Sequence, residues 1–141
     1  MDALGYRKKI GIIVPSTNTI VGPECEDLRP RGVTNHVARL TIKERPILAS
    51  EQGFLAHVEA MREGIGPAID QVMTLAPDAV IMGVAIEAFT GGVAGADALQ
   101  KELSARAGVR VAMGFNCGGG RLAEIRRQTH CRAHAASAQG R

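Results

Sequence analysis

Four short apolar segments, each of strand length, alternate along this chain with segments of helical spacing. The first, Lys9–Val14, shows no alternation of polar and apolar residues, which is typical of a strand buried on both faces. The others span Val33–Ile42, Asp78–Ala85 and Val109–Gly114. Strands separated by helices predict βαβ units, a mainly parallel sheet of about four strands and helices on both faces. The expected fold class is therefore a three-layer α/β/α arrangement.

The segments between these strands carry helix signals. Pro23–Leu28 begins with proline and is acidic early, as in the first turn of a short helix. A longer helix is expected after Ser50, which can serve as its N-cap. Its apolar residues recur every three or four positions, at Phe54, Leu55, Val58, Met61, Ile65, Ile69, Val72 and Met73. Gly64–Pro67 is expected to break or kink this helix, and Gly95–Gly108 is expected to form a third helix that ends at its last glycine.

Length and charge exclude several classes of protein. The 141 residues suit one domain, and no apolar run approaches the roughly 18 residues of a membrane span. Residues 1–114 contain 12 Lys and Arg against 13 Asp and Glu, whereas residues 115–141 contain 5 Arg and a single acid, Glu124. The net charge of +3 therefore comes from the last residues, and the body does not resemble a nucleic-acid binder.

Cysteine usage and the start of the chain bear on the compartment. The three cysteines are widely spaced and odd in number, which favours reduced thiols. The first residues, "MDALGYRKK", lack the apolar segment of a secretory signal. We therefore expect a cytoplasmic protein.

Two polar loops follow strands of the predicted sheet. They are "PSTNT", Pro15–Thr19, and "VAIEAFTGG", Val84–Gly92. Parallel sheets bind ligands at the carboxyl ends of their strands. The hydroxyls of Ser16 and Thr17, the amide of Asn18 and nearby backbone N–H groups are suited to bind a carboxylate or enolate. Helix caps and turns are the alternative explanation for such residues, but the position of the two loops favours a ligand site.

The sequence also resembles a known family. "IGIIVPSTNTIVGPE", then "GVTNHVARL", then "DAVIMGVAIEAFTGG" occur in an order and spacing similar to the maleate cis–trans isomerase and arylmalonate decarboxylase branch of the aspartate/glutamate racemase superfamily. The resemblance runs from about Lys9 to Gly114. It implies an enzyme without cofactors, made of two similar α/β halves that face one cleft, and residues 1–114 would be the first half.

The resemblance implies a chemistry as well. In the isomerases each half offers a cysteine, and one thiolate adds to the double bond of maleate. Rotation about the resulting single bond and elimination then give fumarate. In the decarboxylases only the second half has the cysteine, which reprotonates an enediolate. By similarity, Asn18 would contact the substrate carboxylate, with Ser16 and Thr17 lining the same loop.

This chain departs from the family pattern in the second loop. The isomerase cysteine would fall at Val84, and the donor hydroxyls of the decarboxylases would fall at Val84 and Ala85. Neither a thiol nor a hydroxyl is present there, so no catalytic residue is intact. The backbone N–H groups of Ala85 and Ile86 could still face a ligand, and binding could survive where covalent chemistry does not.

Other reactive residues have ordinary explanations. Glu87 is expected to be a solvated acid in a first helical turn. Cys25 lies among acids, whose charges should raise the pKa of its thiol and disfavour the nucleophilic thiolate. His36 and His57 fall on a predicted strand and helix, where surface or core roles are commoner. Cys117, His130, Cys131 and His134 lack the paired spacing of a zinc site, so no metal is expected.

Residues 115–141 do not continue the pattern of the preceding chain. Back-translated with permitted codon choices and read one nucleotide later, the residues from about Gly119 spell A-A-W-R-K-Y-G-A-K-R-I-A-V-L-T-P-H-Q-P, preceded by one more alanine. That string predicts a helix followed by a strand. Our hypothesis is that the reading frame shifts near Gly114 to Asn116, which would leave a basic, disordered tail and a truncated enzyme half. Sequencing the gene through this region tests it.

Three hypotheses of function remain at this point. The first is a half of a cofactor-independent isomerase or decarboxylase, inactive as it stands. The second is a carboxylate-binding module without catalysis. The third, which rests on residues 115–141 alone, is a basic or zinc-binding interaction protein. The partner expected is a small carboxylate or dicarboxylate rather than nucleic acid or membrane, and a homo-oligomer is compatible with the sequence.

Overall fold

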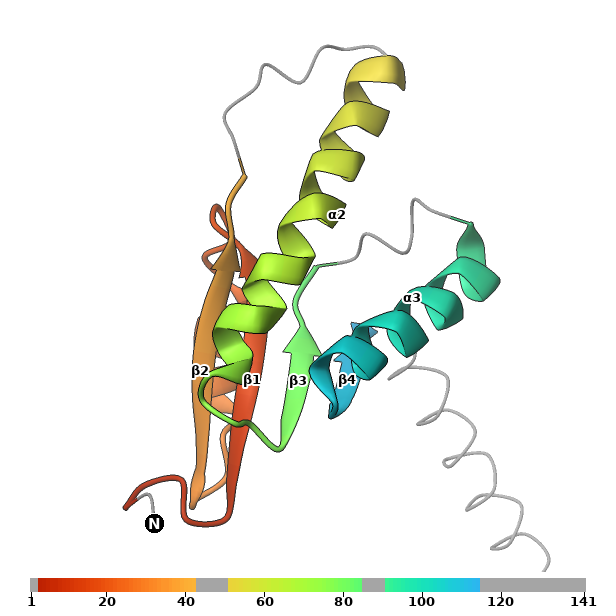
Figure 1. Ribbon diagram of the computed structural model, residues 1–141. Coiled ribbons are helices and arrows are strands. Elements are labelled where there is room, and N and C mark those ends of the chain that lie inside the picture. Colours follow the sequence, from red (N-terminus) through yellow and green to blue (C-terminus); the bar gives the residue numbers. More distant parts are fainter. Residues whose placement is uncertain (1–2, 43–50, 85–90, 115–141) are drawn as a thin grey trace, which may run out of the picture.

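The computed structural model describes residues 3–42, 51–84 and 91–114, which form a four-stranded sheet with three helices (Figure 1). All strand pairings are parallel, and the strand order is β2-β1-β3-β4. The elements, in chain order, are β1 Lys8–Pro15, α1 Val21–Asp27, β2 Val33–Leu40, α2 Glu51–Met73, β3 Ala79–Met82, α3 Gly92–Ala107 and β4 Arg110–Met113. The predicted α/β class is confirmed.

The sheet is built outward from β1, which pairs with β2 on one side and with β3 on the other. The chain first crosses from β1 to β2, and then returns past β1 to β3 and β4. Because such crossovers are right-handed, reversing direction places α1 on one face of the sheet and α2 and α3 on the other. In Figure 1 α2 and α3 lie in front of the strands. The strands β1, β2 and β3 end at the same edge of the sheet, since Ile13 pairs with Ala38 and with Met82.

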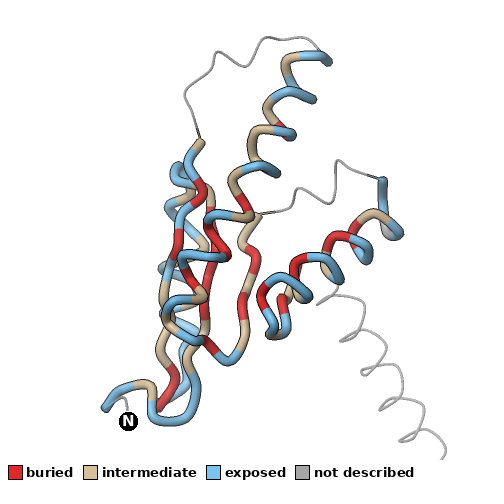
Figure 2. Tube along the Cα trace, in the orientation of Figure 1, coloured by how far each residue is buried: buried red, intermediate tan, exposed pale blue. Residues whose placement is uncertain are grey.

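The main core lies between the sheet and the helices α2 and α3. Figure 2 shows buried residues along the strands and along the sides of the two helices that face them. Ile13, at the centre, is fully buried in this cluster, while its neighbours Ile12 and Val14 are buried on the opposite face. The remaining buried members are Ala38, Leu40, Val58, Ile65, Ala68, Ile69, Val72, Val80, Met82, Leu99, Leu103, Ala107, Val111 and Met113.

The helix α2 differs from its prediction in one respect. A break or kink at Gly64–Pro67 was expected, and no break occurs, because α2 runs without interruption from Glu51 to Met73 with Pro67 inside it. Residues on both sides of the proline are buried against the sheet, among them Ile65 and Ile69, so tertiary packing outweighs the cost of one lost helical hydrogen bond. A Cβ at Gly64 would lie 3.5 Å from Cβ of Leu40, an ordinary contact, so α2 passes close to β2 without requiring glycine at this position.

The first turns of α2 extend beyond the ends of the strands (Figure 1). Phe54 and Leu55, which the periodicity places on the apolar side, are 38% and 54% exposed there. Val58 is the first buried residue of the helix. The expected N-cap, Ser50, lies outside the described residues.

The third helix begins earlier than expected, at Gly92, and ends as expected. Gly108 has a φ of 66°, and its N–H binds the carbonyl of Ser104, as in a left-handed helix C-terminus. The tail 115–141 lies outside the described residues. Within residues 3–42, 51–84 and 91–114, no helix is both long and apolar enough to cross a membrane.

Asp78 fastens the amino end of β3 to β1. Its Oδ1 lies 2.6 Å from Nζ of Lys8, and its Oδ2 accepts a hydrogen bond of 2.8 Å from the backbone N–H of Lys9. The backbone N–H of Asp78 in turn binds the carbonyl of Lys9 at 2.8 Å. The hydrogen bond from Lys8 and that from the backbone of Lys9 hold the pKa of Asp78 below its usual value.

We predict that Asp78→Asn lowers stability at neutral pH and not in acid. A carboxyl whose pKa is depressed by folding stabilises the protein above its unfolded-state pKa, about 3.9, and this contribution is lost as the pH falls through the folded value. Urea unfolding of the variant and the unaltered chain should therefore differ at pH 7, and the difference should shrink as the pH falls from about 4 through the folded pKa of Asp78. Asp97→Asn, which removes an exposed acid of α3, is the control, and an equal loss at both pH values would contradict the prediction.

Candidate functional site

The loop after β1 is a tight turn held against the end of β2. The N–H of Asn18 binds the carbonyl of Pro15 at 3.0 Å, which closes the turn. The N–H of Ser16 binds the carbonyl of Leu40 at 2.8 Å, and its Oγ accepts a hydrogen bond of 3.0 Å from the N–H of Ile42. Ser16 therefore joins the ends of two strands. Its hydroxyl proton remains able to donate, since the side chain acts as acceptor in that bond.

Asn18 caps the start of α1 through its side-chain oxygen. Oδ1 accepts hydrogen bonds from the N–H groups of Ile20 and Val21, at 3.0 and 2.9 Å. This is the helix-cap role considered as the alternative to ligand binding. The two roles are compatible, because a carboxamide has two ends. Nδ2 of Asn18, the donor that a carboxylate needs, has no partner among the described residues.

Thr17 and Thr19 complete the loop. Both are exposed, and no hydrogen bond involves either residue within the part of the chain that the structure describes. Their hydroxyls and backbone N–H groups are therefore unpaired donors within the described residues. Together with Nδ2 of Asn18 they form a short row of free donors at the carboxyl edge of the sheet, where such folds place ligands.

A cation that the sequence reasoning did not single out organises this loop. Arg39, near the end of β2 and paired in register with Val14, donates from Nη1 to three loop carbonyls. The distances are 2.9 Å to Asn18, 3.2 Å to Ser16 and 3.4 Å to Pro15, so the first two bonds are the stronger. No local pattern predicts this role, because the contacts arise only when β2 is in register with β1.

The second loop begins close to the first. The N–H of Gly83, just after β3, binds the carbonyl of Ile13 at 2.7 Å. A Cβ at Gly83 would lie 2.8 Å from Cγ1 of Val14 and 2.9 Å from Cγ1 of Val21, so only glycine fits between β1 and α1. Val84, at the position of the family cysteine, is half-buried and packs against the core. The remaining predicted positions, Ala85 and Ile86, lie outside the described residues, as does Glu87.

Cys25 behaves as an unreactive thiol. It is half-buried on α1, and its pKa is raised above the ordinary value of a thiol, first by burial and then by the charge of Glu24. The sequence predicted the direction from the neighbouring acids, but burial is the larger cause. A raised pKa leaves less thiolate at neutral pH, so this position does not supply a nucleophile.

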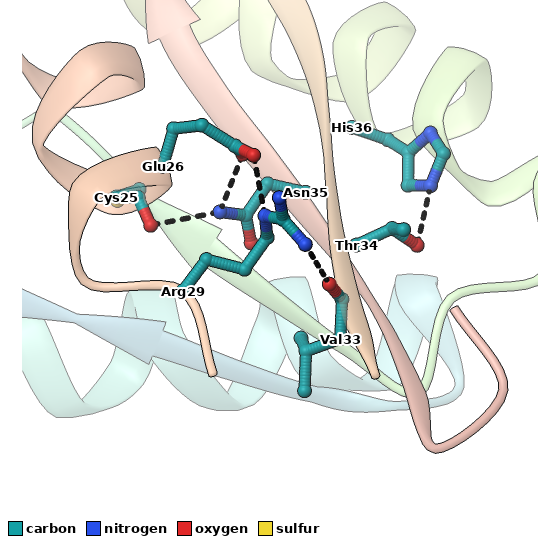
Figure 3. Close-up of polar contacts among 7 residues, drawn as sticks. All are labelled: Cys25, Glu26, Arg29, Val33, Thr34, Asn35 and His36. Carbon is teal, nitrogen blue, oxygen red and sulfur yellow. Dashed lines mark hydrogen bonds and ion pairs between the residues drawn. The ribbon is translucent and has the colours of Figure 1, made fainter. Parts of the chain in front are cut away.

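The polar residues around Cys25 fasten α1 to β2 (Figure 3). Nδ2 of Asn35 donates to the carbonyl of Cys25 at 2.8 Å and to the carboxylate of Glu26 at 3.2 Å. Arg29 pairs with the same carboxylate and donates to the carbonyl of Val33 at 2.8 Å. Every charged group of this cluster has a partner, so its role is structural.

The two described histidines show no sign of a catalytic role. Nε2 of His36 lies 3.0 Å from Oγ1 of Thr34, its neighbour on the same face of β2 (Figure 3). His57 is half-buried on α2. Over the described ranges, no group of three or more His, Cys, Asp or Glu is placed to hold a metal ion.

A groove of about 440 Å³ separates α2 from α3. Its charged lining mixes both signs, with Arg62 and Arg106 beside Glu59, Glu63 and Glu102. The three acids outnumber the two arginines, and Arg106 is also paired with Asp70, so this lining does not favour an anion. The loop Pro15–Thr19 therefore remains the better candidate site.

Comparison of the chain with protein-family models and with curated proteins finds no match. The assignment to the isomerase and decarboxylase family therefore stays a proposal.

We predict that Gly83→Ala destabilises the protein by about 1–3 kcal/mol, because the added methyl group would collide with Val14 and Val21. Gly114→Ala is the matched control, since a Cβ there would meet no atom within 4 Å. The free energy of unfolding, measured in urea, checks both variants. Equal stability of the two would show that the ends of β1 and β3 do not meet as closely as described.

Proposed function

We propose that this chain is the first half of the cleft of a cofactor-independent enzyme, of the type that isomerises maleate to fumarate, and that it binds a small carboxylate or dicarboxylate through Ser16, Thr17 and Asn18. An arylmalonate decarboxylase-like or racemase-like half is the related alternative. The observation that carries the proposal is the row of free donors in the loop after β1. A loop that served only as a cap would use its polar groups internally, as Asn18 does with Oδ1.

The free groups match the needs of a carboxylate. An ionised carboxyl accepts hydrogen bonds at about four lone-pair positions. Nδ2 of Asn18, the hydroxyls of Ser16 and Thr17 and the loop N–H groups are all donors, and bonds to an ionised acceptor are stronger than neutral ones. The close approach of Gly83 to Ile13 and Val14 brings the start of the second loop beside the same edge.

Binding without turnover is the function we propose for the chain as it stands. Val84 offers packing where the family resemblance calls for a thiol, and the thiol of Cys25 has a raised pKa. Losing a nucleophile abolishes covalent catalysis even where binding persists. These two observations favour a carboxylate-binding module over an active isomerase.

We predict that Asn18→Asp keeps the hydrogen bonds that Asn18 makes to the start of α1 and removes its contact with the ligand. The aspartate keeps an oxygen for the N–H groups of Ile20 and Val21, so the melting temperature should hold or rise slightly. It replaces the Nδ2 donor with a negative charge, so calorimetry with maleate should show binding at least about tenfold weaker. Asn18→Ala is the comparison variant, and it should lose both binding and about 0.5–2 kcal/mol of stability.

Two outcomes would count against the proposal. Unchanged maleate affinity in Asn18→Asp would mean that the loop after β1 is not the site. Conversion of maleate to fumarate by the unaltered chain would mean that a catalytic group is present after all. The change in ultraviolet absorbance between the two isomers measures this conversion.

A further inference from the structure

We infer that Arg39 is the positioning residue of this loop, and that it acts by turning the backbone N–H groups of Thr17 and Thr19 outward as contacts for an anionic ligand. This inference rests on the proposed carboxylate binding at Ser16–Asn18 and adds to it a residue from a different strand. It also gives a physical cause for the orientation of two backbone donors already described.

The first step is the geometry of the guanidinium. Nη1 of Arg39 carries two hydrogens, and the two shorter of its three loop contacts are to the carbonyls of Ser16 and Asn18, at 3.2 and 2.9 Å. Both carbonyl oxygens therefore point toward the same nitrogen. This fixes the orientation of two peptide planes in the loop, Ser16–Thr17 and Asn18–Thr19.

The second step follows from the peptide bond. In a planar trans peptide the C=O and the next N–H point in opposite directions, and the described residues include no cis peptide bond. The N–H groups of Thr17 and Thr19 therefore point away from Arg39, on the opposite side of the loop. In the described part of the chain, neither has a hydrogen-bond partner. The intervening N–H of Asn18 is used in the turn, where it binds the carbonyl of Pro15.

The third step concerns why arginine is needed. Three carbonyl oxygens gathered in one place repel one another unless a cation lies among them. Arg39 supplies that charge from β2. Ser16 holds the loop against the carboxyl end of the same strand through its hydrogen bonds with Leu40 and Ile42. A lysine would keep the charge, but all three contacts come from Nη1, and a lysine side chain ends one bond short of the place of that atom. Loop orientation, rather than charge alone, should therefore depend on arginine.

The test compares Arg39→Gln, Arg39→Lys and the control Arg110→Gln, which removes an equal charge from an exposed residue of β4. Maleate and, separately, inorganic phosphate are titrated into each protein while the amide proton resonances are recorded. In the unaltered chain and in the control, the Thr17 and Thr19 resonances should move downfield with maleate. In Arg39→Gln and Arg39→Lys the affinity should fall by at least about tenfold, with resonances of β3 and β4 unchanged. A response to phosphate as strong as that to maleate would make the site a general anion site and overturn its assignment to carboxylates.

Spectra recorded without ligand test separately whether Arg39 orients the loop. If Arg39 orients the loop, both substitutions should shift and broaden the Thr17 and Thr19 resonances before any ligand is added. Unaltered resonances there, or maleate affinity in Arg39→Lys equal to that of the unaltered chain, would overturn the inference. Absence of maleate binding by the unaltered chain would instead overturn the proposed function, and with it the ligand contact of Thr17 and Thr19. The ligand-free spectra would still decide whether Arg39 orients the loop.

Discussion

The pairing of β1 on both of its edges is the constraint on which the rest of the structure depends. β1 hydrogen-bonds to β2 along its whole length and to β3 over four residues, so every other element is placed relative to it. Its apolar run fills both faces, with Ile13 toward α2 and Ile12 and Val14 toward α1. Backbone pairing in a parallel sheet requires both faces to be covered, and this is why helices lie on either side of so small a sheet.

The same strand also determines where chemistry can occur. The carboxyl ends of β1, β2 and β3 meet at one edge, so the loop after β1 is held from β2 by Arg39 and Ser16, while Gly83 approaches it from β3. The side chain of Arg39 and the bonds of Ser16 to Leu40 and Ile42 thus fix the orientation of one short loop. Polar residues that look like simple caps in the sequence therefore divide their groups, with some holding the loop and others unpaired among the described residues. Asn18 shows this division within one side chain.

Much of this architecture was predictable because it depends on local patterns. Unbroken apolar runs indicated buried strands, the order of strands and helices indicated a parallel sheet, and Gly108 indicated where α3 ends. The continuity of α2 through Pro67 was not predictable, because the burial of Ile65 and Ile69 against the sheet outweighs a local cost. Nor was the role of Arg39, since its contacts lie 21 to 24 residues away along the chain and arise only when β2 is in register with β1.

The projection of α2 past the sheet gives this helix two parts with different dynamics. From Val58 onward, the buried residues of the helix are in the core, and their amide groups can exchange with solvent only when much of the domain opens. In the first turns Phe54 and Leu55 are exposed, so these turns are less buried than the rest of the helix, and a less buried helix end opens locally more easily. The rate of amide hydrogen exchange along this one helix should therefore vary by orders of magnitude. Exchange should be slow in the part packed against the sheet and fast in the first turns, which extend beyond the strands.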